Sequence, residues 1–152
     1  MIKKIFLIFF LLNFFNYSYA SVENKIINNF KKINNISFNF KQIIDEKTEE
    51  GNCIIQYPKK IYCSYDNFKK KIIVSNGKSL VIKNRATNQY FRYPLKKTPL
   101  DILLNKNYII EKMENADGKL INDMYFNFLL KNSESEINIF FDKNSYELIG
   151  WQ

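Results

Sequence analysis

Histidine is absent from this chain of 152 residues, and glycine is scarce, with four residues in all. The absence of histidine removes the usual general base, the commonest metal ligand and every Ser-His or Cys-His nucleophile pair. The glycines, at positions 51, 77, 118 and 150, are too isolated to form a loop that cradles phosphate. The sequence therefore predicts a protein that is not an enzyme and that has no metal site and no cofactor.

Carboxylates cluster at one place only, in the pairs Asp45-Glu46 and Glu49-Glu50. A paired-carboxylate catalytic site is one interpretation of this stretch. However, nothing nearby in the sequence is expected to perturb the pKa values of these side chains. We therefore interpret the stretch as a solvated turn between strands.

Arginine is also rare, although the chain is basic. Lysine and arginine together number 23 against 15 acidic residues, which gives a formal net charge of +8. Only Arg85 and Arg92 offer the planar guanidinium that nucleic-acid recognition favours, and the lysines are spread along the chain. The pattern indicates a diffusely basic, soluble surface and no nucleic-acid partner. An anionic membrane surface or an acidic protein partner is left as an alternative.

The first 20 residues have the features of a signal peptide. Two lysines, at positions 3 and 4, precede an apolar run at 5–12 that is too short to span a bilayer. Ser18 and Ala20 are small residues at the positions that a signal peptidase reads. We therefore predict cleavage after Ala20 and export of residues 21–152 as a single domain, with an uncleaved membrane anchor as the alternative.

Hydrophobic periodicity predicts one helix followed by strands. Apolar residues from Val22 to Ile33 recur at helical spacing, and Ser21 is placed to cap this helix. From Ile36 onward the period is two, which is typical of half-buried strands. Strands are predicted from Ile36 and then at 51–57, 61–65, 70–75, 78–83, 89–93, 124–130, 136–141 and 146–151.

Two local signals lie between these strands. Asn76-Gly77 predicts a two-residue hairpin turn of type I′, in which both central residues have positive φ. The segment 98–101 predicts a helix with Thr98 as its cap, Pro99 in the first position and Asp101 facing the free amides. The apolar side of this helix carries Leu100, Leu103 and Leu104. The stretch 108–113 is compatible with either helix or strand.

This order of elements predicts an α+β fold that is mainly antiparallel β. A strongly curved sheet with two helices on its concave side would bury the leucines of the second helix. Periodicity alone does not distinguish a filled core from a ligand cavity, and a filled core is the default interpretation.

The two cysteines, Cys53 and Cys63, lie at equal distances from Pro58 in a chain predicted to be exported. If the loop between their strands has an odd number of residues, the cysteines lie opposite each other and can form a disulfide. A two-residue loop at Pro58-Lys59 would place them on opposite faces. Alternation favours the first register, because Ile55 and Ile61 then share one apolar face with both cysteines. We therefore predict a structural disulfide.

Several short segments, taken together, resemble a known family, the outer-membrane lipoprotein carrier protein (LolA) family. The resemblance runs from the first helix to Gln152. It rests on the order and spacing of Phe40-Lys41-Gln42, Gly51 with Pro58 seven residues later, the stretch 72–80, Gln89, and Thr98-Pro99-Leu100 with Leu103. The resemblance implies an incomplete β-barrel, or half-barrel, with a helical lid that covers the concave face and encloses an apolar cavity.

The resemblance also implies a function. Members of this family carry acylated lipoproteins through the periplasm, from an inner-membrane ABC transporter to an outer-membrane acceptor. We therefore expect a monomeric periplasmic carrier, with a lipid-binding sensor or regulatory protein of the same fold as the alternative. Ile61, Leu100 and Leu103 sit where the family places cavity-lining side chains. The full set of residues expected to line the acyl-chain site is Phe38, Phe40, Ile55, Tyr57, Ile61, Leu100, Leu103 and Leu104.

Two features depart from the family pattern. Tyr57 stands where the family has an arginine before the proline, so a polar contact proposed to hold the lid closed is not made in the same way. We expect the tyrosine hydroxyl to bond a backbone carbonyl instead. The chain also stops before the family's last strands, which leaves a truncated fragment, a shortened relative and a frame-shifted gene as alternatives.

Overall fold

The computed structural model describes residues 21–66, 70–131 and 136–152. The predicted signal peptide therefore lies outside the described residues. Within the described ranges, no helix is both long enough and apolar enough to cross a membrane.

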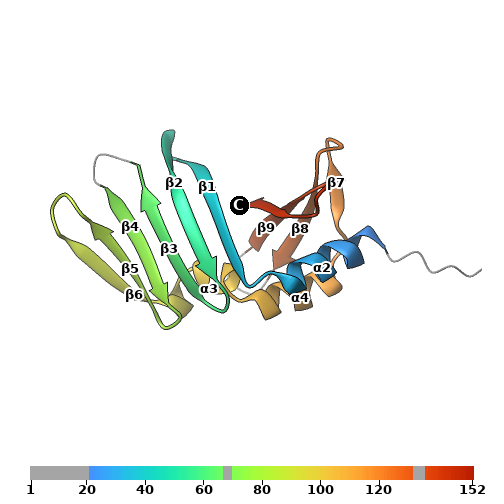
Figure 1. The fold of residues 1–152 in the computed structure, drawn as a ribbon, viewed down its shortest axis with the longest axis horizontal. Coiled ribbons are helices and arrows are strands. Elements are labelled where there is room, and N and C mark those ends of the chain that lie inside the picture. Colours follow the sequence, from blue (N-terminus) through green and yellow to red (C-terminus); the bar gives the residue numbers. More distant parts are fainter. Residues whose placement is uncertain (1–20, 67–69, 132–135) are drawn as a thin grey trace, which may run out of the picture.

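The structure begins with one helix and continues mainly as strands (Figure 1). The first part contains α2 (Val22–Lys32), β1 (Asn35–Ile44), β2 (Lys47–Gln56), β3 (Lys60–Tyr65), β4 (Lys71–Asn76), β5 (Ser79–Asn84) and β6 (Tyr90–Pro94). A short helical region follows, made of η2 (Leu95–Lys97), α3 (Leu100–Leu103) and α4 (Lys106–Glu114). The last strands are β7 (Lys119–Ile121), β8 (Tyr125–Lys131), β9 (Glu136–Asp142) and β10 (Leu148–Trp151).

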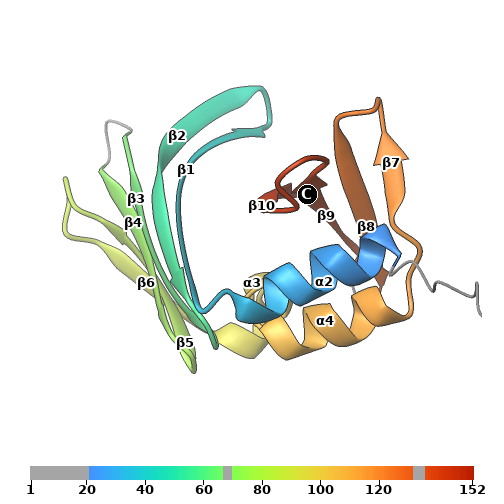
Figure 2. The same cartoon turned by 45° about the vertical axis from the view of Figure 1, so that its right-hand side comes forward.

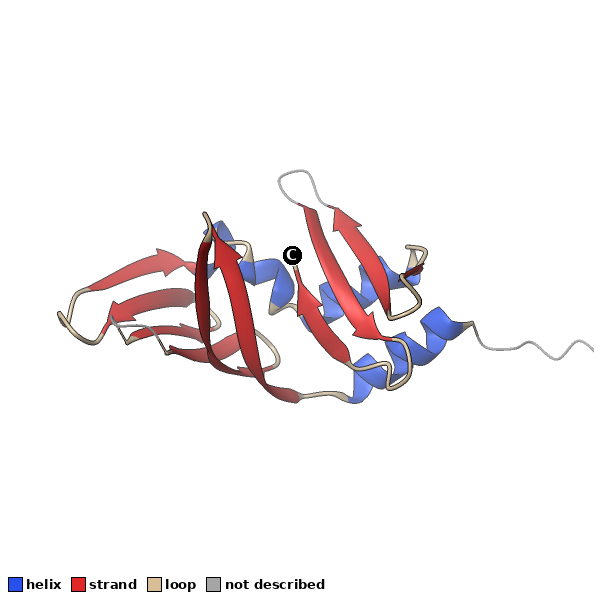
Figure 3. Ribbon diagram, turned by 90° about the horizontal axis from the view of Figure 1, so that it is seen from above, coloured by secondary structure: helices blue, strands red, loops and turns tan. Residues whose placement is uncertain are grey.

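The strands form two antiparallel sheets, where the sequence suggested one. The first sheet has the order β1-β2-β3-β4-β5-β6, and the second has the order β10-β9-β8-β7. Figure 2 shows β1 and β2 curving on one side, β7, β8 and β9 on the other, and helices α2 and α4 running side by side beneath them. Seen from above, the strands lie over the helices (Figure 3). The predicted α+β half-barrel is confirmed, because the antiparallel strands curve above the helices in two separate sheets and do not close into a barrel.

The first helix forms as the sequence predicts. The Ser21 hydroxyl accepts a hydrogen bond from the Asn24 amide at 3.3 Å, which satisfies one of the free donors at the helix start. Ile26, Ile27 and Phe30 are buried along one side. Phe30 meets Tyr57, the residue directly after β2, and Phe141 of the second sheet edge to face, with ring centres 5.8 Å apart in both pairs. This helix therefore joins the two sheets in one core.

A hairpin joins β4 and β5 here, but its two loop residues are Gly77 and Lys78 rather than Asn76 and Gly77, so the predicted centre and the predicted type are both wrong. Gly77 has φ of 93°, whereas Lys78 is not among the residues with positive φ, so the turn is not type I′. The reason is local, since the Asn76 side-chain oxygen accepts hydrogen bonds from the amides of Lys78 and Ser79, both at 3.0 Å. Two consecutive positive φ values occur instead at Asp45-Glu46, between β1 and β2, and at Asn122-Asp123, between β7 and β8.

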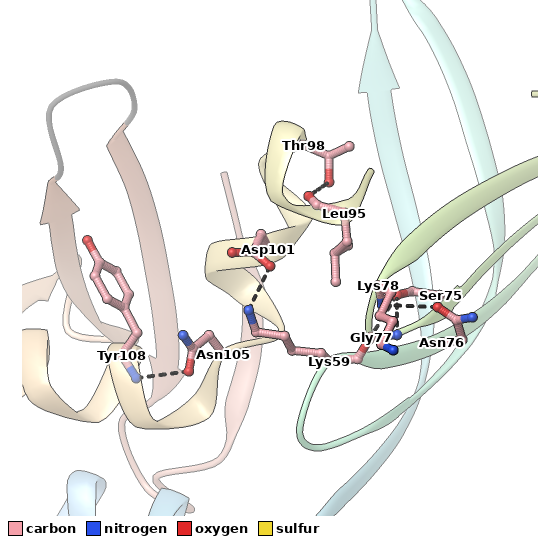
Figure 4. A network of polar contacts seen from close by, with 10 residues as sticks. All are labelled: Lys59, Ser75, Asn76, Gly77, Lys78, Leu95, Thr98, Asp101, Asn105 and Tyr108. Carbon is pink, nitrogen blue, oxygen red and sulfur yellow. Dashed lines mark hydrogen bonds and ion pairs between the residues drawn. The ribbon is translucent and has the colours of Figure 1, made fainter. Parts of the chain in front are cut away.

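The helical region after β6 differs from its prediction in two ways. Thr98 does not cap α3, because its hydroxyl donates to the Leu95 carbonyl at 2.8 Å and closes the preceding turn (Figure 4). The ambiguous stretch 108–113 is helical and belongs to α4, where the Asn105 side chain accepts from the Tyr108 amide at 3.3 Å. Asn105 is therefore the N-cap of α4, and this signal in the sequence would have favoured helix over strand for 108–113. The short strand β7 had no counterpart in the sequence prediction.

Candidate functional site

The register of the first sheet brings the predicted apolar residues onto one inner face. Three residues, 57–59, separate β2 from β3, so Ile55 pairs with Ile61 and Cys53 pairs with Cys63. This is the first of the two registers considered for this hairpin. The cysteine Cα atoms are 4.1 Å apart, and the two sulfur atoms are bonded. Strand β1 adds Phe38 directly opposite Cys53.

The eight predicted site residues lie together but at different depths. Ile55, Tyr57, Ile61 and Leu104 belong to the buried core cluster, and Leu103 is also buried, with 1% of its surface exposed. The remaining three, Phe38, Phe40 and Leu100, are half-buried and pack against that cluster. Residues from the first sheet and from the helical region therefore share one apolar interior. The deepest of them pack against other side chains of the protein.

Helix α3 is tied to the β2–β3 loop through Lys59. The Lys59 amide donates to the Leu104 carbonyl at 2.9 Å, and its ammonium lies 2.8 Å from an Asp101 carboxylate oxygen. Its carbonyl accepts from the Ser75 hydroxyl at 2.9 Å (Figure 4). Asp101 lies in the first turn of α3, as the sequence predicts, and its carboxylate pairs with Lys59. Because the ion pair is partly exposed, it contributes at most about 1 kcal/mol, so the tie is modest.

Tyr57 occupies the end of the inner face where α2, α4 and the first sheet meet. Its ring contacts Phe30, and the Lys106 ammonium lies 6.0 Å from the ring centre. Burial raises the pKa of the Tyr57 hydroxyl well above its usual value, so the group is neutral. Among the described residues this hydroxyl has no hydrogen-bond partner. The expectation that it bonds a backbone carbonyl is therefore wrong.

The Lys106 side chain donates hydrogen bonds to the backbone carbonyls at this junction. Its ammonium donates to the carbonyls of Lys31 and Ile33 at 2.8 and 2.7 Å, where α2 ends. A cation at the carboxyl end of a helix stabilises the free carbonyls there. Sequence reasoning missed this contact because the two segments are more than 70 residues apart.

The opposite end of the inner face carries a polar cluster that the sequence analysis assigned to a solvated turn. Glu49 lies within β2, 2.6 Å from the Lys71 ammonium and 2.7 Å from the Gln42 amide nitrogen. The same ammonium lies 3.8 Å above the centre of the Tyr65 ring. Burial and the Glu49 charge raise the pKa of Tyr65, while a hydrogen bond with Gln42 lowers it. The inner face thus runs from an ion pair at one end to apolar side chains at the other.

A shallow pocket also lies on the second sheet, but on the face turned away from the core. It is lined by Tyr125, Phe140, Ile149 and Gly150. These positions alternate with the buried residues of β8 and β9. The pocket therefore does not belong to the apolar interior that the predicted residues share.

The geometry defines an α+β half-barrel with an apolar inner face, held against a short helix by few polar contacts. Residues 31–152 match the family model described as outer membrane lipoprotein carrier protein LolA, and the chain belongs to this family. The matched range includes every predicted site residue. It is a family of periplasmic lipoprotein carriers rather than of enzymes. A search among curated proteins finds no match.

Proposed function

We propose that the protein binds the acyl chains of lipoproteins against the inner face of the first sheet and ferries them across the periplasm. It would receive them from an inner-membrane ABC transporter and deliver them to an outer-membrane acceptor, acting as a monomer after cleavage behind Ala20. Family membership supports the carrier role. The observation that carries the proposal is the gathering of predicted residues from β1, β2, β3 and α3 in one apolar interior.

A carrier of this kind meets a physical requirement. Each acyl methylene transferred from water to an apolar environment gains about 0.8 kcal/mol, so a lipid-modified protein does not leave a membrane without a partner that buries its chains. The carrier must also release them, which favours a cover of low stability. Neither nucleotide nor nucleophile is needed for binding and release of this type.

Helix α3 has the properties expected of such a cover. It is a single turn of four residues, and an isolated helix of that length has little stability of its own. Its polar ties to the β2–β3 loop are one amide hydrogen bond and one partly exposed ion pair, both from Lys59. Acyl chains would displace Leu100, Leu103 and Leu104 from the inner face and then occupy the space that these side chains leave.

The direct test places a charge on the inner face. Phe38→Glu is expected to weaken binding of a triacylated lipopeptide at least tenfold, because the carboxylate would be desolvated by the acyl chains. Phe38 suits this test better than Leu103, because it is only half-buried and its replacement leaves the deepest core intact. Binding is measured by titration with protein purified from the periplasm, and the melting temperature confirms that the variant is folded.

The matched control is Ser37→Glu. Ser37 is the preceding residue of β1, is exposed, and points to the opposite face of the sheet. The control should bind the lipopeptide as the wild type does. If folded Phe38→Glu also binds with wild-type affinity, the inner face of the first sheet is not the acyl-chain site.

Mass spectrometry of the gently purified protein separates the carrier from the lipid-binding sensor of the same fold. A co-purified acylated lipoprotein supports the carrier. Free lipid without a polypeptide supports the sensor. An absence of any ligand, together with no lipopeptide binding, supports a protein whose interior is only a core.

A further inference from the structure

The Tyr57 hydroxyl is a buried polar group without a hydrogen bond among the described residues. Tyr57 has 9% of its surface exposed, and no described residue accepts from or donates to its hydroxyl. A buried hydroxyl without a partner costs free energy, so buried polar groups are nearly always hydrogen-bonded. Phenylalanine would supply the same ring without this cost.

The named neighbours of Tyr57 have other partners. The nearby Lys106 ammonium is held by two carbonyls at the end of α2. The Tyr57 amide already donates to the Asn34 carbonyl at 2.9 Å. Phe30, the aromatic neighbour, offers only the edge and face of its ring. The protein therefore presents a neutral donor in an apolar setting, at a junction of α2, α4 and the first sheet.

An acyl chain supplies the complementary acceptor. Its tail is apolar and suits Ile55 and Ile61, which lie next to Tyr57 on the same inner face. The ester that joins the chain to its glyceryl group carries a carbonyl oxygen, which accepts a hydrogen bond from a neutral phenol. A bond formed in this low-dielectric setting strengthens binding, since neither partner is left unpaired.

We propose that the Tyr57 hydroxyl donates a hydrogen bond to the ester carbonyl of a bound acyl chain, and so selects ester-linked lipid over hydrocarbon of the same length. This inference rests on the proposed function and deepens it. The hydroxyl is then a prepared binding group, and the free-energy cost of burying it is offset by the hydrogen bond to the cargo.

The test compares two probes that differ only in the carbonyl. One is a peptide whose amino-terminal cysteine carries two chains through glyceryl esters, and the other carries the same chains through glyceryl ethers. Wild-type protein should bind the ester probe about three- to tenfold more tightly, which corresponds to one net hydrogen bond. Tyr57→Phe should bind both probes with the affinity that the wild type has for the ether. Titration of purified full-length protein measures all four affinities.

The stability of the empty protein supplies a second readout. Tyr57→Phe should melt at the same temperature as the wild type or higher, because it removes a buried hydroxyl that has no partner. A purely structural tyrosine would show the opposite change, with a lower melting temperature. Tyr62→Phe is the matched control, because Tyr62 lies on β3 with its side chain exposed on the other face. It should leave the ester preference unchanged.

The outcomes are distinct. If Tyr57→Phe keeps the wild-type preference for ester, or if the wild type has no such preference, the role of Tyr57 is overturned while the proposed function stands. If the wild type binds neither probe, the proposed function fails as well. A preference that disappears in Tyr57→Phe and persists in Tyr62→Phe supports the inference.

Discussion

Phe141→Ala is expected to lower the free energy of unfolding by about 3–5 kcal/mol, the usual cost of removing a buried phenylalanine. Phe141 is fully buried on the inner face of β9. Its ring meets Phe30 of α2 and Phe128 of β8 edge to face, with centres 5.8 Å apart in both pairs. The substitution would therefore leave a cavity at the place where the second sheet is joined to the first helix.

Urea denaturation followed by circular dichroism measures this loss. The matched control is Phe140→Ala, the preceding residue of the same strand, which is half-buried on the opposite face beside Tyr125. It should lose less than half as much stability as Phe141→Ala. Equal losses in the two variants would mean that the inner face of the second sheet is not part of the main core.

The strands were largely predictable because a half-buried strand leaves a period of two in the sequence. In β1 the inner positions Ile36, Phe38 and Phe40 alternate with exposed polar residues, and the structure follows this alternation until the last two residues of the strand, which are both exposed. The division into two sheets was not predictable. No strand before the helical region pairs with a strand after it, and the two sheets meet through packing on the helices, which leaves no local pattern in the sequence.

The helix ends show where local signals compete. Thr98 has the sequence features of a cap, but its hydroxyl bonds the Leu95 carbonyl and supports η2 instead. Asn105 caps α4, yet the apolar run after it also suits a strand. Side chains that can bond nearby backbone atoms have several partners within reach, and tertiary contacts choose among them.

The apolar part of the candidate site was predicted from alternation and from the family resemblance together. The polar part was not. Glu49 reads as part of a charged turn, and its place on the inner face follows only from the register of β2 with β1 and β3. Lys59 and Lys106 bond groups that are distant in the sequence. The unpaired hydroxyl of Tyr57 is likewise visible only when every neighbour has been placed.

Replacement of both cysteines, Cys53→Ala with Cys63→Ala, is expected to lower the free energy of unfolding by about 2–3 kcal/mol. This follows from the entropy that a short cross-linked loop removes from the unfolded chain, here with a sequence separation of 10. Urea denaturation measures the loss. Before that, thiol alkylation of denatured, unreduced wild-type protein should label neither cysteine, and labelling of both would show that the protein has no such bond.

Reduction of the wild type provides the control for this double variant. Reduced wild type and the double alanine variant should unfold at nearly the same urea concentration, because both lack the cross-link and differ only in two small buried side chains. A stable reduced protein beside an unstable alanine variant would assign the loss to packing and not to the bond.

The disulfide is expected to affect release as well, because it joins β2 to β3 at Cys53, four residues before Tyr57. It limits how far the two strands can move apart next to their connecting loop when α3 moves. If the bond has this role, the double variant should release a bound lipopeptide faster than the wild type does.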